Sequence, residues 1–247
     1  VPFNDAAALE RLLQAEGDRI ACLIMEPVMM NIGIVVPADG YLQAVRDLCT
    51  RYGVVLIFDE VKCGATIAEG GAQERFGVQP DLATWAKAIG GGAPIGAFGG
   101  RADIMEEINR GAAHQGTFNG NPMSVTAALA TLTRVLTADA YEHFAALGAR
   151  LSNGMDALIA EYDLPAHTVD LGCKGCISYR AEPLTCYRDF LETNIHLYTA
   201  SYPWMVNRGV FMTPGDEEQW TLSVQHSEDH VDRYVDAFAT FAAELTR

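Results

Sequence analysis

Short apolar runs alternate with helical patterns along the first half of the chain. Residues 20–27, "IACLIMEP", and residues 54–58, "VVLIF", are apolar almost throughout, which is typical of strands covered on both faces. Between them, residues 41–52 repeat apolar side chains at helical spacing, and Asp39 precedes this pattern as a candidate cap. Further short strands are predicted at residues 81–87 and 94–100. The alternation predicts an α/β fold with a mostly parallel sheet and helices on both of its faces.

The pattern changes towards the C-terminal half. A helical pattern begins at Asn121, a second one follows it, and the chain closes with an amphipathic helix preceded by Ser227. Short strands are predicted between these helices, at "CISYR", "GVFMT" and "WTLSVQ". We therefore predict two domains, with residues 1–136 as part of a large α/β domain and residues 137–247 as a smaller α+β domain.

Composition narrows the kind of protein. The 247 residues contain no apolar run long enough to span a bilayer, and the 32 acidic residues outnumber the 17 basic ones. This excess of negative charge argues against nucleic acids and anionic membranes as partners. Any anionic ligand must therefore be held by a local device such as a helix N-terminus or a few backbone amides.

The six cysteines are scattered along the chain, as in proteins of a reducing compartment, so we expect a cytoplasmic protein. Cys173 and Cys176 form one CxxC pair, but no second pair of ligands stands at a spacing suited to zinc. We therefore predict no metal site.

Two ionisable residues stand at the ends of separate predicted strands. Asp59 follows "VVLIF" directly, and Lys87 ends the stretch "DLATWAK". In parallel sheets, ligands bind beyond the carboxyl ends of the strands. A lysine amine can form a Schiff base with an aldehyde and a carboxylate can hold a proton on a pyridine nitrogen, and pyridoxal phosphate needs both groups. From the residues alone, a capping role for Asp59 and an ordinary surface position for Lys87 remain alternatives.

The residues beside this pair suit an aromatic ring. The glycines at 90–92 remove side chains just after Lys87, so that the backbone can approach a bound ring closely. Val61 would project to the same side as Asp59 if the extended geometry continues, and from there it would pack on the ring face.

Longer motifs around these residues resemble one enzyme family. "FDEV" at 58–61, "GGAQERFGVQPDLATWAKAIGGGAPIGAFGG" at 70–100 and "GTFNGNP" at 116–122 resemble the class III pyridoxal-phosphate-dependent aminotransferases. "EPVMMNIG" at 26–33 and the segment 219–238 are similar to the glutamate-1-semialdehyde aminomutase branch. The resemblance covers essentially the whole chain. It implies the fold type I of pyridoxal-phosphate-dependent transferases, with the first predicted domain as the C-terminal part of the large, cofactor-binding domain.

The resemblance also implies roles for particular residues. Lys87 would be the Schiff-base lysine and proton shuttle, and Asp59 the partner of the pyridine nitrogen, which makes these two the catalytic pair. Val61 would pack on one face of the cofactor ring. Thr117 would reach the cofactor phosphate of the neighbouring subunit in a homodimer, and Glu218 would face the substrate. A turn residue is the alternative interpretation for Thr117, and an exposed charged turn for Glu218.

The implied function is transfer of an amino group with pyridoxal phosphate through a lysine Schiff base. The enzyme would be an aminotransferase or a relative of glutamate-1-semialdehyde 2,1-aminomutase, acting on small-molecule amino donors and acceptors. A pyridoxal-phosphate enzyme of another reaction type on the same scaffold, and a catalytically incomplete fragment, remain alternatives.

The chain departs from the family pattern in two ways. Lys62 stands where relatives have Met or Gln, and Thr66 stands where relatives have Arg, so the resemblance leaves the contacts of these side chains open. The family also has a substantial region before the position of Val1, which supplies a phosphate-binding turn and an aromatic ring stacked on the cofactor. We therefore expect exposed apolar surface where that region would pack.

Overall fold

The chain divides into two compact units in a computed structural model, which describes residues 1–215 and 219–245. The first unit comprises Val1–Pro27 and Pro37–Thr137, and the second unit comprises Val28–Val36 and Ala138–Arg247. The division predicted after residue 136 lies one residue before the end of the first unit. Residues 28–36, which that prediction assigned to the first domain, group with the second unit.

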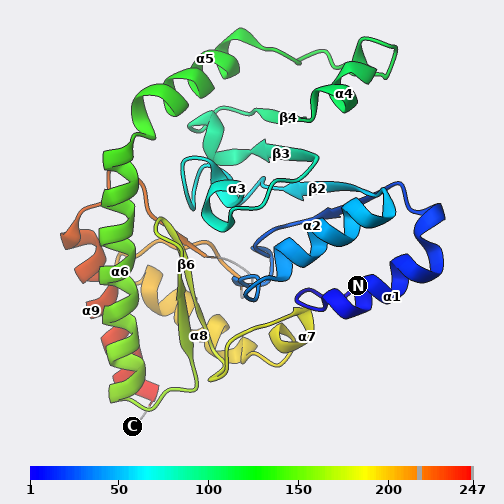
Figure 1. The fold of residues 1–247 in the computed structure, drawn as a ribbon. Helices are drawn as coiled ribbons and strands as arrows, with labels where there is room; N and C mark the ends of the chain where they lie inside the picture. The colour runs from blue at the N-terminus through cyan, green and yellow to red at the C-terminus, as the bar shows by residue number, and fades with distance from the viewer. Residues whose placement is uncertain (216–218, 246–247) are drawn as a thin grey trace. The chain divides into compact units, whose positions relative to one another are not determined.

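The first unit is built on a four-stranded sheet (Figure 1). Its strands lie in the order β1 (Cys22–Met25), β2 (Val55–Asp59), β3 (Leu82–Ala86) and β4 (Gly96–Gly100). β1, β2 and β3 run parallel to one another, and β4 runs antiparallel to β3. The prediction of an α/β fold with a mostly parallel sheet is therefore confirmed.

Two helices, α1 (Ala6–Glu16) and α2 (Tyr41–Tyr52), cover one face of this sheet. Their apolar sides form a core with Leu56 and Phe58 of β2, both of which are fully buried. Successive side chains of a strand point to opposite faces, so these two residues share the face under the helices. Burying each of them contributes about 2 kcal/mol, which makes this face the main core of the unit.

The two helices begin with different caps. The Asp5 carboxylate caps α1 by accepting a hydrogen bond of 2.8 Å from the Ala8 N–H. At α2 the cap position is taken by Gly40 with a φ of 76°, and Asp39 lies one position earlier. Glycine adopts this left-handed conformation at little cost, so Gly40 can turn the chain into the helix. The prediction that Asp39 caps this helix is therefore wrong.

The opposite face of the sheet carries exposed apolar side chains. Ile24 of β1 is 60% exposed and Phe98 of β4 is 44% exposed, and β1 forms one edge of the sheet. The prediction that residues 20–27 are covered on both faces is wrong, because only Leu23 and Met25 of β1 pack on the helical core. This face is an exposed apolar surface of the kind expected from the sequence.

Short helices make up most of the rest of the first unit. They are η1 (Gly17–Arg19), α3 (Gly71–Phe76), η2 (Lys87–Gly90), α4 (Ala102–Met105), η3 (Glu106–Ile108), α5 (Pro122–Ala130) and η4 (Thr131–Val135). α5 begins where the sequence predicts, because the Asn121 side chain accepts a hydrogen bond of 2.9 Å from the Met123 N–H.

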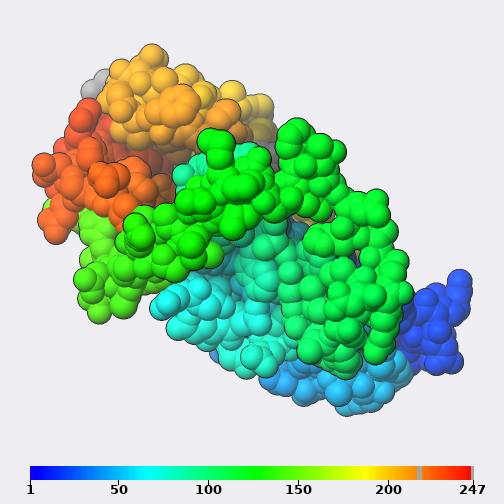
Figure 2. Space-filling view, turned by 90° about the horizontal axis from the view of Figure 1, so that it is seen from above, coloured from blue at the N-terminus to red at the C-terminus, as the bar shows by residue number. Residues whose placement is uncertain are grey.

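The segment around α5 carries large apolar side chains at the surface. Figure 2 shows this green stretch lying on the outside of the molecule. Phe118, Met123 and Leu129 are each more than half exposed, and we call these three residues the α5 patch. Exposed large apolar side chains gathered along one segment are a feature of sites where another protein chain binds.

The second unit combines helices with a small antiparallel sheet. The sheet has the strand order β5 (His167–Asp170), β6 (Lys174–Ser178) and β7 (Trp220–Thr221), and the helices are α6 (Ala138–Glu161), α7 (Tyr187–Phe190), α8 (Ile195–Val206) and α9 (Glu228–Leu245). α6 and α9 pack against each other, and a side chain at Gly154 of α6 would collide with Val235 of α9. The predicted α+β architecture of this part is observed.

Two local features of the second unit differ from the prediction. The stretch "GVFMT" was expected to be a strand, but the Val210 N–H donates to the Met205 carbonyl at 3.0 Å and closes the end of α8. The Gln219 side chain donates hydrogen bonds of 2.9 and 3.0 Å to the carbonyls of Met30 and Gly33. These bonds explain why the segment 28–36 groups with the second unit.

Two predictions from composition concern membrane-spanning helices and the state of the cysteines. Among the described helices, none combines the length and the apolar character that crossing a bilayer requires. All six cysteines lie in the described ranges, and none of them forms a disulfide bond.

Candidate active site

Asp59 is the last residue of β2 and its side chain is half-buried. Its Oδ1 atom accepts a hydrogen bond of 3.1 Å from the Val61 N–H and one of 3.4 Å from the Thr84 hydroxyl. No residue in the described ranges donates to Oδ2. One oxygen is thus held by the protein while the other is available to a ligand.

Lys87 follows β3 directly and its side chain is exposed. Its φ is 51°, a left-handed conformation that costs a residue other than glycine about 1–3 kcal/mol. Such outliers persist where the surrounding structure enforces them, and they concentrate at functional sites.

The chain has three lysines, and they differ in their surroundings. The Lys174 amine donates a hydrogen bond of 2.7 Å to the Thr221 hydroxyl, and Lys62 also interacts with a neighbouring group. The Lys87 amine has no hydrogen-bond or ion-pair partner within residues 1–215 and 219–245. This amine is therefore the one most open to reaction with a ligand.

The sheet brings Asp59 and Lys87 to the same edge. β2 and β3 are parallel neighbours, with Asp59 opposite Thr84 in the register. Lys87 lies three residues beyond Thr84. At a rise of about 3.3 Å per residue, the Cα atoms of Thr84 and Lys87 are at most about 10 Å apart. A lysine side chain together with one pyridine ring can span that separation. Asp59 and Lys87 therefore lie at the carboxyl ends of two strands, as expected from the sequence, and the two strands are parallel neighbours.

Among the glycines after Lys87, Gly91 packs closely against Thr131, a contact that was not predicted from the sequence. Gly91 has a φ of 56°, and a Cβ atom there would collide with the hydroxyl oxygen of Thr131 in η4. Gly92 also has a left-handed φ, of 98°. Close packing between the loop after Lys87 and η4 therefore accounts for glycine at position 91.

The three other predicted site residues lie in different settings. Val61 does not continue the strand, because β2 ends at Asp59 and residues 61–66 form turns, so the condition for its predicted direction is not met. Thr117 is exposed, and no residue of the described chain is hydrogen-bonded to its hydroxyl. Glu218 lies outside the described residues.

The turn after Asp59 shows what replaces the expected arginine. Thr66 is buried, and its hydroxyl donates hydrogen bonds to the carbonyls of Cys63, at 2.7 Å, and Lys62, at 3.1 Å. Thr66 therefore bonds back to the turn that precedes it.

Two further residues of this site were missed from the sequence. Thr84 binds the Asp59 carboxylate, and Glu60 is a fully buried acid directly after Asp59. The signal for Thr84 was its register opposite Asp59, which becomes visible only once the two strands are paired. The signal for Glu60 was a second acid at the end of a strand that is otherwise apolar.

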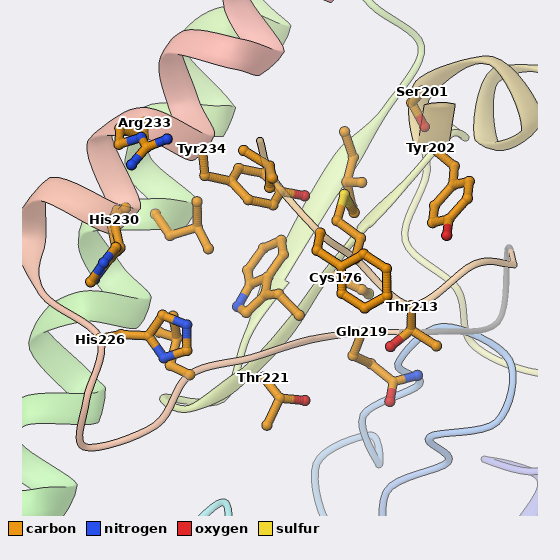
Figure 3. Close-up of a pocket in the computed structure, with 18 of the residues that line it drawn as sticks. Cys176, Ser201, Tyr202, Thr213, Gln219, Thr221, His226, His230, Arg233 and Tyr234 are labelled. Atoms are coloured by element: carbon orange, nitrogen blue, oxygen red, sulfur yellow. The ribbon is translucent and has the colours of Figure 1, made fainter. Parts of the chain in front are cut away.

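The second unit contains a separate cavity of about 340 Å³ (Figure 3). Aromatic and polar side chains line it, among them Tyr202, Gln219, His226 and Tyr234. The Tyr234 hydroxyl points towards the cavity in Figure 3, and burial raises the pKa of this phenol above its ordinary value. None of the predicted site residues that the structure describes lines this cavity.

Within the described part of the chain, no group of three or more His, Cys, Asp or Glu side chains is arranged to hold a metal ion.

Comparison with known proteins decides the family. Residues 3–178 match the family model described as aminotransferase class-III. The chain belongs to the class III aminotransferases. The family recognised from the sequence motifs is thereby confirmed.

Curated class III relatives support the predicted branch. The chain is 39% identical to a glutamate-1-semialdehyde 2,1-aminomutase of Thermomicrobium roseum, over 100% of this chain and 58% of the relative. It is 41% identical to the enzyme of the same name from Sorangium cellulosum, over 96% of this chain and 54% of the relative. The chain thus spans little more than half the length of these relatives.

Solved structures of similar chains confirm the fold. A glutamate-1-semialdehyde aminomutase from Pseudomonas aeruginosa, crystallised with PMP, gives a TM-score of 0.91 at 29% identity, covering 99% of this chain and 56% of its own. An omega-transaminase from Sphaerobacter thermophilus gives 0.91 at 33% identity, over 98% and 56% of the two chains. A beta-phenylalanine aminotransferase from Variovorax paradoxus gives 0.90 at 30% identity, over 99% and 57%. Three enzymes with different names therefore share the fold of this chain.

Proposed function

We propose that the protein containing these residues transfers amino groups with pyridoxal phosphate, as an aminotransferase or an aminomutase. The observation that carries this proposal is the pairing of Asp59 and Lys87 at one edge of the sheet. Each of them has a polar atom without a partner among the described residues, namely Asp59 Oδ2 and the Lys87 amine. An acid and an amine so placed match the two ends of the cofactor's pyridine ring.

The residues present fit this cofactor. Asp59 Oδ2 would hold the proton on the pyridine nitrogen, and the bonds from Val61 and Thr84 to Oδ1 would keep the carboxylate oriented. When bound, pyridoxal phosphate supplies an electron-poor ring that stabilises negative charge on the substrate carbon. The Lys87 amine would bind the cofactor aldehyde and, once displaced by an incoming amine, move a proton at the substrate carbon.

The remaining candidate residues extend this proposal. Val61, next to Asp59 in the turn, would contact the ring, and Glu218 would face the substrate. Thr117 would bind the cofactor phosphate of a second copy of the chain, with its exposed hydroxyl as the donor. The α5 patch lies next to Thr117 in the sequence and supports a homodimer, because it offers apolar surface for a second copy to cover.

The substrates in this proposal are small amino donors and acceptors. The names of the relatives, which include an aminomutase, a beta-phenylalanine aminotransferase and an omega-transaminase, support this class. A cytoplasmic location also remains a proposal, supported by the six free cysteines.

The proposal can be tested by trapping the cofactor on its lysine. The protein is mixed with pyridoxal phosphate, reduced with borohydride and digested, and the modified peptide is identified by mass spectrometry. We expect the label on Lys87 and none in Lys87→Ala. Lys174→Ala is the matched control, because Lys174 is already bonded to Thr221, and it should label like the parent. Equal labelling of all three lysines, or labelling that survives in Lys87→Ala, would contradict the proposal.

A further inference from the structure

Glu60 is a fully buried carboxylate that directly follows Asp59. Its Oε2 atom accepts a hydrogen bond of 2.7 Å from the Ala72 N–H, and its Oε1 atom accepts one of 2.9 Å from the Gln73 side chain. Both donors are neutral groups that belong to α3. Burying a carboxylate costs several kcal/mol unless such bonds hold it, so its presence here requires a specific role.

The backbone of Glu60 ties two further elements together. Its N–H donates to the Thr84 carbonyl at 3.0 Å, which extends the pairing of β2 with β3 by one residue. Its carbonyl accepts a hydrogen bond of 2.8 Å from the Gly64 N–H, which closes the first turn after the strand. One residue thus joins the ends of both strands, the turn and α3.

Two glycines leave the room that Glu60 occupies. A Cβ atom at Gly71, whose φ is 66°, would collide with the Glu60 carboxylate. A Cβ atom at Gly64 would lie 2.7 Å from the Glu60 carbonyl oxygen and 2.6 Å from the Trp85 ring. The loop from residue 60 to residue 72 is therefore shaped around this one side chain.

The same loop controls the orientation of Asp59. Asp59 is half-buried between two fully buried neighbours, Phe58 and Glu60, so its backbone has little freedom. The Val61 N–H, which holds Asp59 Oδ1, is the next amide after Glu60. If the loop loosens at Glu60, this amide is no longer held in place and the Asp59 carboxylate can rotate.

We propose that Glu60 is the positioning residue of the active site, which holds the loop from residue 60 to residue 72 closed so that Asp59 presents Oδ2 to a ligand. This inference rests on the function proposed for Asp59. Glu60 itself touches neither substrate nor cofactor in this account, and it acts through the Val61 amide and the Asp59 carboxylate.

Three variants of the complete gene product test the proposal. Glu60→Ala leaves the Ala72 N–H and the Gln73 amide without an acceptor. Glu60→Gln is the conservative variant, because its amide oxygen can accept from Ala72 while the Gln73 amide turns to accept from its NH₂ group. Asp81→Asn is the matched control, since Asp81 is a buried acid bonded to a backbone N–H at the opposite end of β3.

The first measurement uses protein without cofactor. Amide hydrogen exchange is compared between Val61 and the buried Val45 of α2, which reports the stability of the core. We expect exchange at Val61 relative to Val45 to rise about tenfold or more in Glu60→Ala, which equals a loss of about 1.4 kcal/mol locally. The ratio should stay within about threefold of the parent in Glu60→Gln, and it should not rise in Asp81→Asn, because a general loss of stability speeds exchange at Val45 at least as much as at Val61.

The second measurement uses pyridoxal phosphate. Glu60→Ala should bind it about tenfold more weakly and shift the pH dependence of its visible absorbance, and Glu60→Gln should restore both. A Glu60→Ala protein with unchanged Val61 exchange and an unchanged absorbance titration would overturn the proposal. Equal changes in Asp81→Asn would overturn it too, because they would reflect general destabilisation. If the parent protein binds no cofactor, the function proposed above fails, while the exchange measurement still decides the role of Glu60.

Discussion

Each end of strand β3 lies beside a buried acid, and the two acids differ in the charge of their hydrogen-bond donors. At the amino end, Asp81 accepts hydrogen bonds from the Leu56 N–H at 2.7 Å, from Arg46 at 2.8 Å and from Arg101 at 2.9 Å. At the carboxyl end, Glu60 accepts hydrogen bonds from neutral groups only.

The pKa values of the two acids follow from these partners. Burial alone would raise the pKa of Asp81, but the bonds from the Leu56 N–H, Arg101 and Arg46 outweigh burial and lower it. Burial raises the pKa of Glu60, and the bonds from Gln73 and the Ala72 N–H offset only part of this effect.

The comparison separates an end of the sheet whose acid is neutralised by the chain from the end where we propose that a ligand binds. Positive charge is supplied by the chain at the amino end, where two arginines neutralise Asp81. Within the described residues, no lysine or arginine pairs with Asp59 or Glu60 at the carboxyl end. A cationic ring held against Asp59 would supply the positively charged partner that Asp59 lacks among the described residues.

The strongest test of the comparison is Asp59→Asn in the complete gene product. We expect the rate of amino-group transfer to fall at least about a hundredfold, the size of effect seen when one electrostatic contact at a reacting centre is lost. The free energy of unfolding should change by less than about 0.5 kcal/mol, because an asparagine oxygen can still accept the Val61 and Thr84 bonds. Steady-state kinetics and urea unfolding measure the two effects. An unchanged rate would remove Asp59 from the mechanism.

The mirror experiment is Asp81→Asn at the amino end. We expect the free energy of unfolding to fall by about 2 kcal/mol, because two charge-assisted hydrogen bonds lose their acceptor charge and Arg46 is left partly buried. The cofactor-dependent rate per folded molecule should stay close to that of the parent. Urea unfolding and active-site titration check this expectation. A loss of rate as large as that of Asp59→Asn would show that the two ends of the sheet are not independent.

The pH dependence of stability should have opposite signs at the two ends. The pKa of Asp81 is lowered from its ordinary value of 3.8, so its contribution is present at neutral pH and is lost as the pH falls through the native pKa. The pKa of Glu60 is raised from 4.5, so its contribution is fully present below that pH and is lost as the pH rises through the native pKa.

Unfolding free energies measured from about pH 3 to about pH 7 would reveal these slopes. The difference between the parent and Asp81→Asn should grow with pH, whereas the difference between the parent and Glu60→Gln should shrink. Slopes of the same sign would show that the charge environments inferred for the two ends are incorrect.

The smallest expected effect concerns the backbone of the reactive lysine. Lys87 has a φ of 51°, and glycine adopts this conformation more easily than lysine. We expect Lys87→Gly to stabilise the fold by up to about 1 kcal/mol while removing cofactor trapping. Thermal unfolding compares it with Lys87→Ala, which keeps the strain and should show no such gain. A Lys87→Gly protein less stable than Lys87→Ala would indicate that the left-handed conformation is not a source of strain.

Much of the first unit could be predicted because its strands are short apolar runs with clear ends. The run at 20–27 contains β1, the run at 54–58 contains all of β2 except its last residue, and the stretches ending at Lys87 and Gly100 contain β3 and β4. What the pattern did not reveal was one-sided burial of β1, because Ile24 is as apolar as the residues that do pack. Apolar character reports what a residue can bury, not what lies beside it.

The missed features depend on contacts between distant parts of the chain. The segment 28–36 joins the second unit through Gln219, some 190 residues away, and no local pattern indicates such a bond. The stretch "GVFMT" has a strand-like composition, but it does not form a strand. Its Val210 N–H donates instead to the Met205 carbonyl at the end of α8. Asp59 and Lys87 could be predicted because chemistry, strand position and family motif coincide there. The buried partner Glu60 could not, since its role appears only when α3 folds back onto the turn.

The position of β1 at the edge of the sheet has a consequence for the solubility of this polypeptide. β1 is an edge strand that carries the exposed apolar side chain of Ile24, and an edge strand of this kind can pair with strands of other molecules. Concentrated preparations of these 247 residues should therefore precipitate by strand addition unless that edge is shielded. Replacing Ile24 with lysine would be the simplest protective change, because a charge at a strand border discourages such stacking.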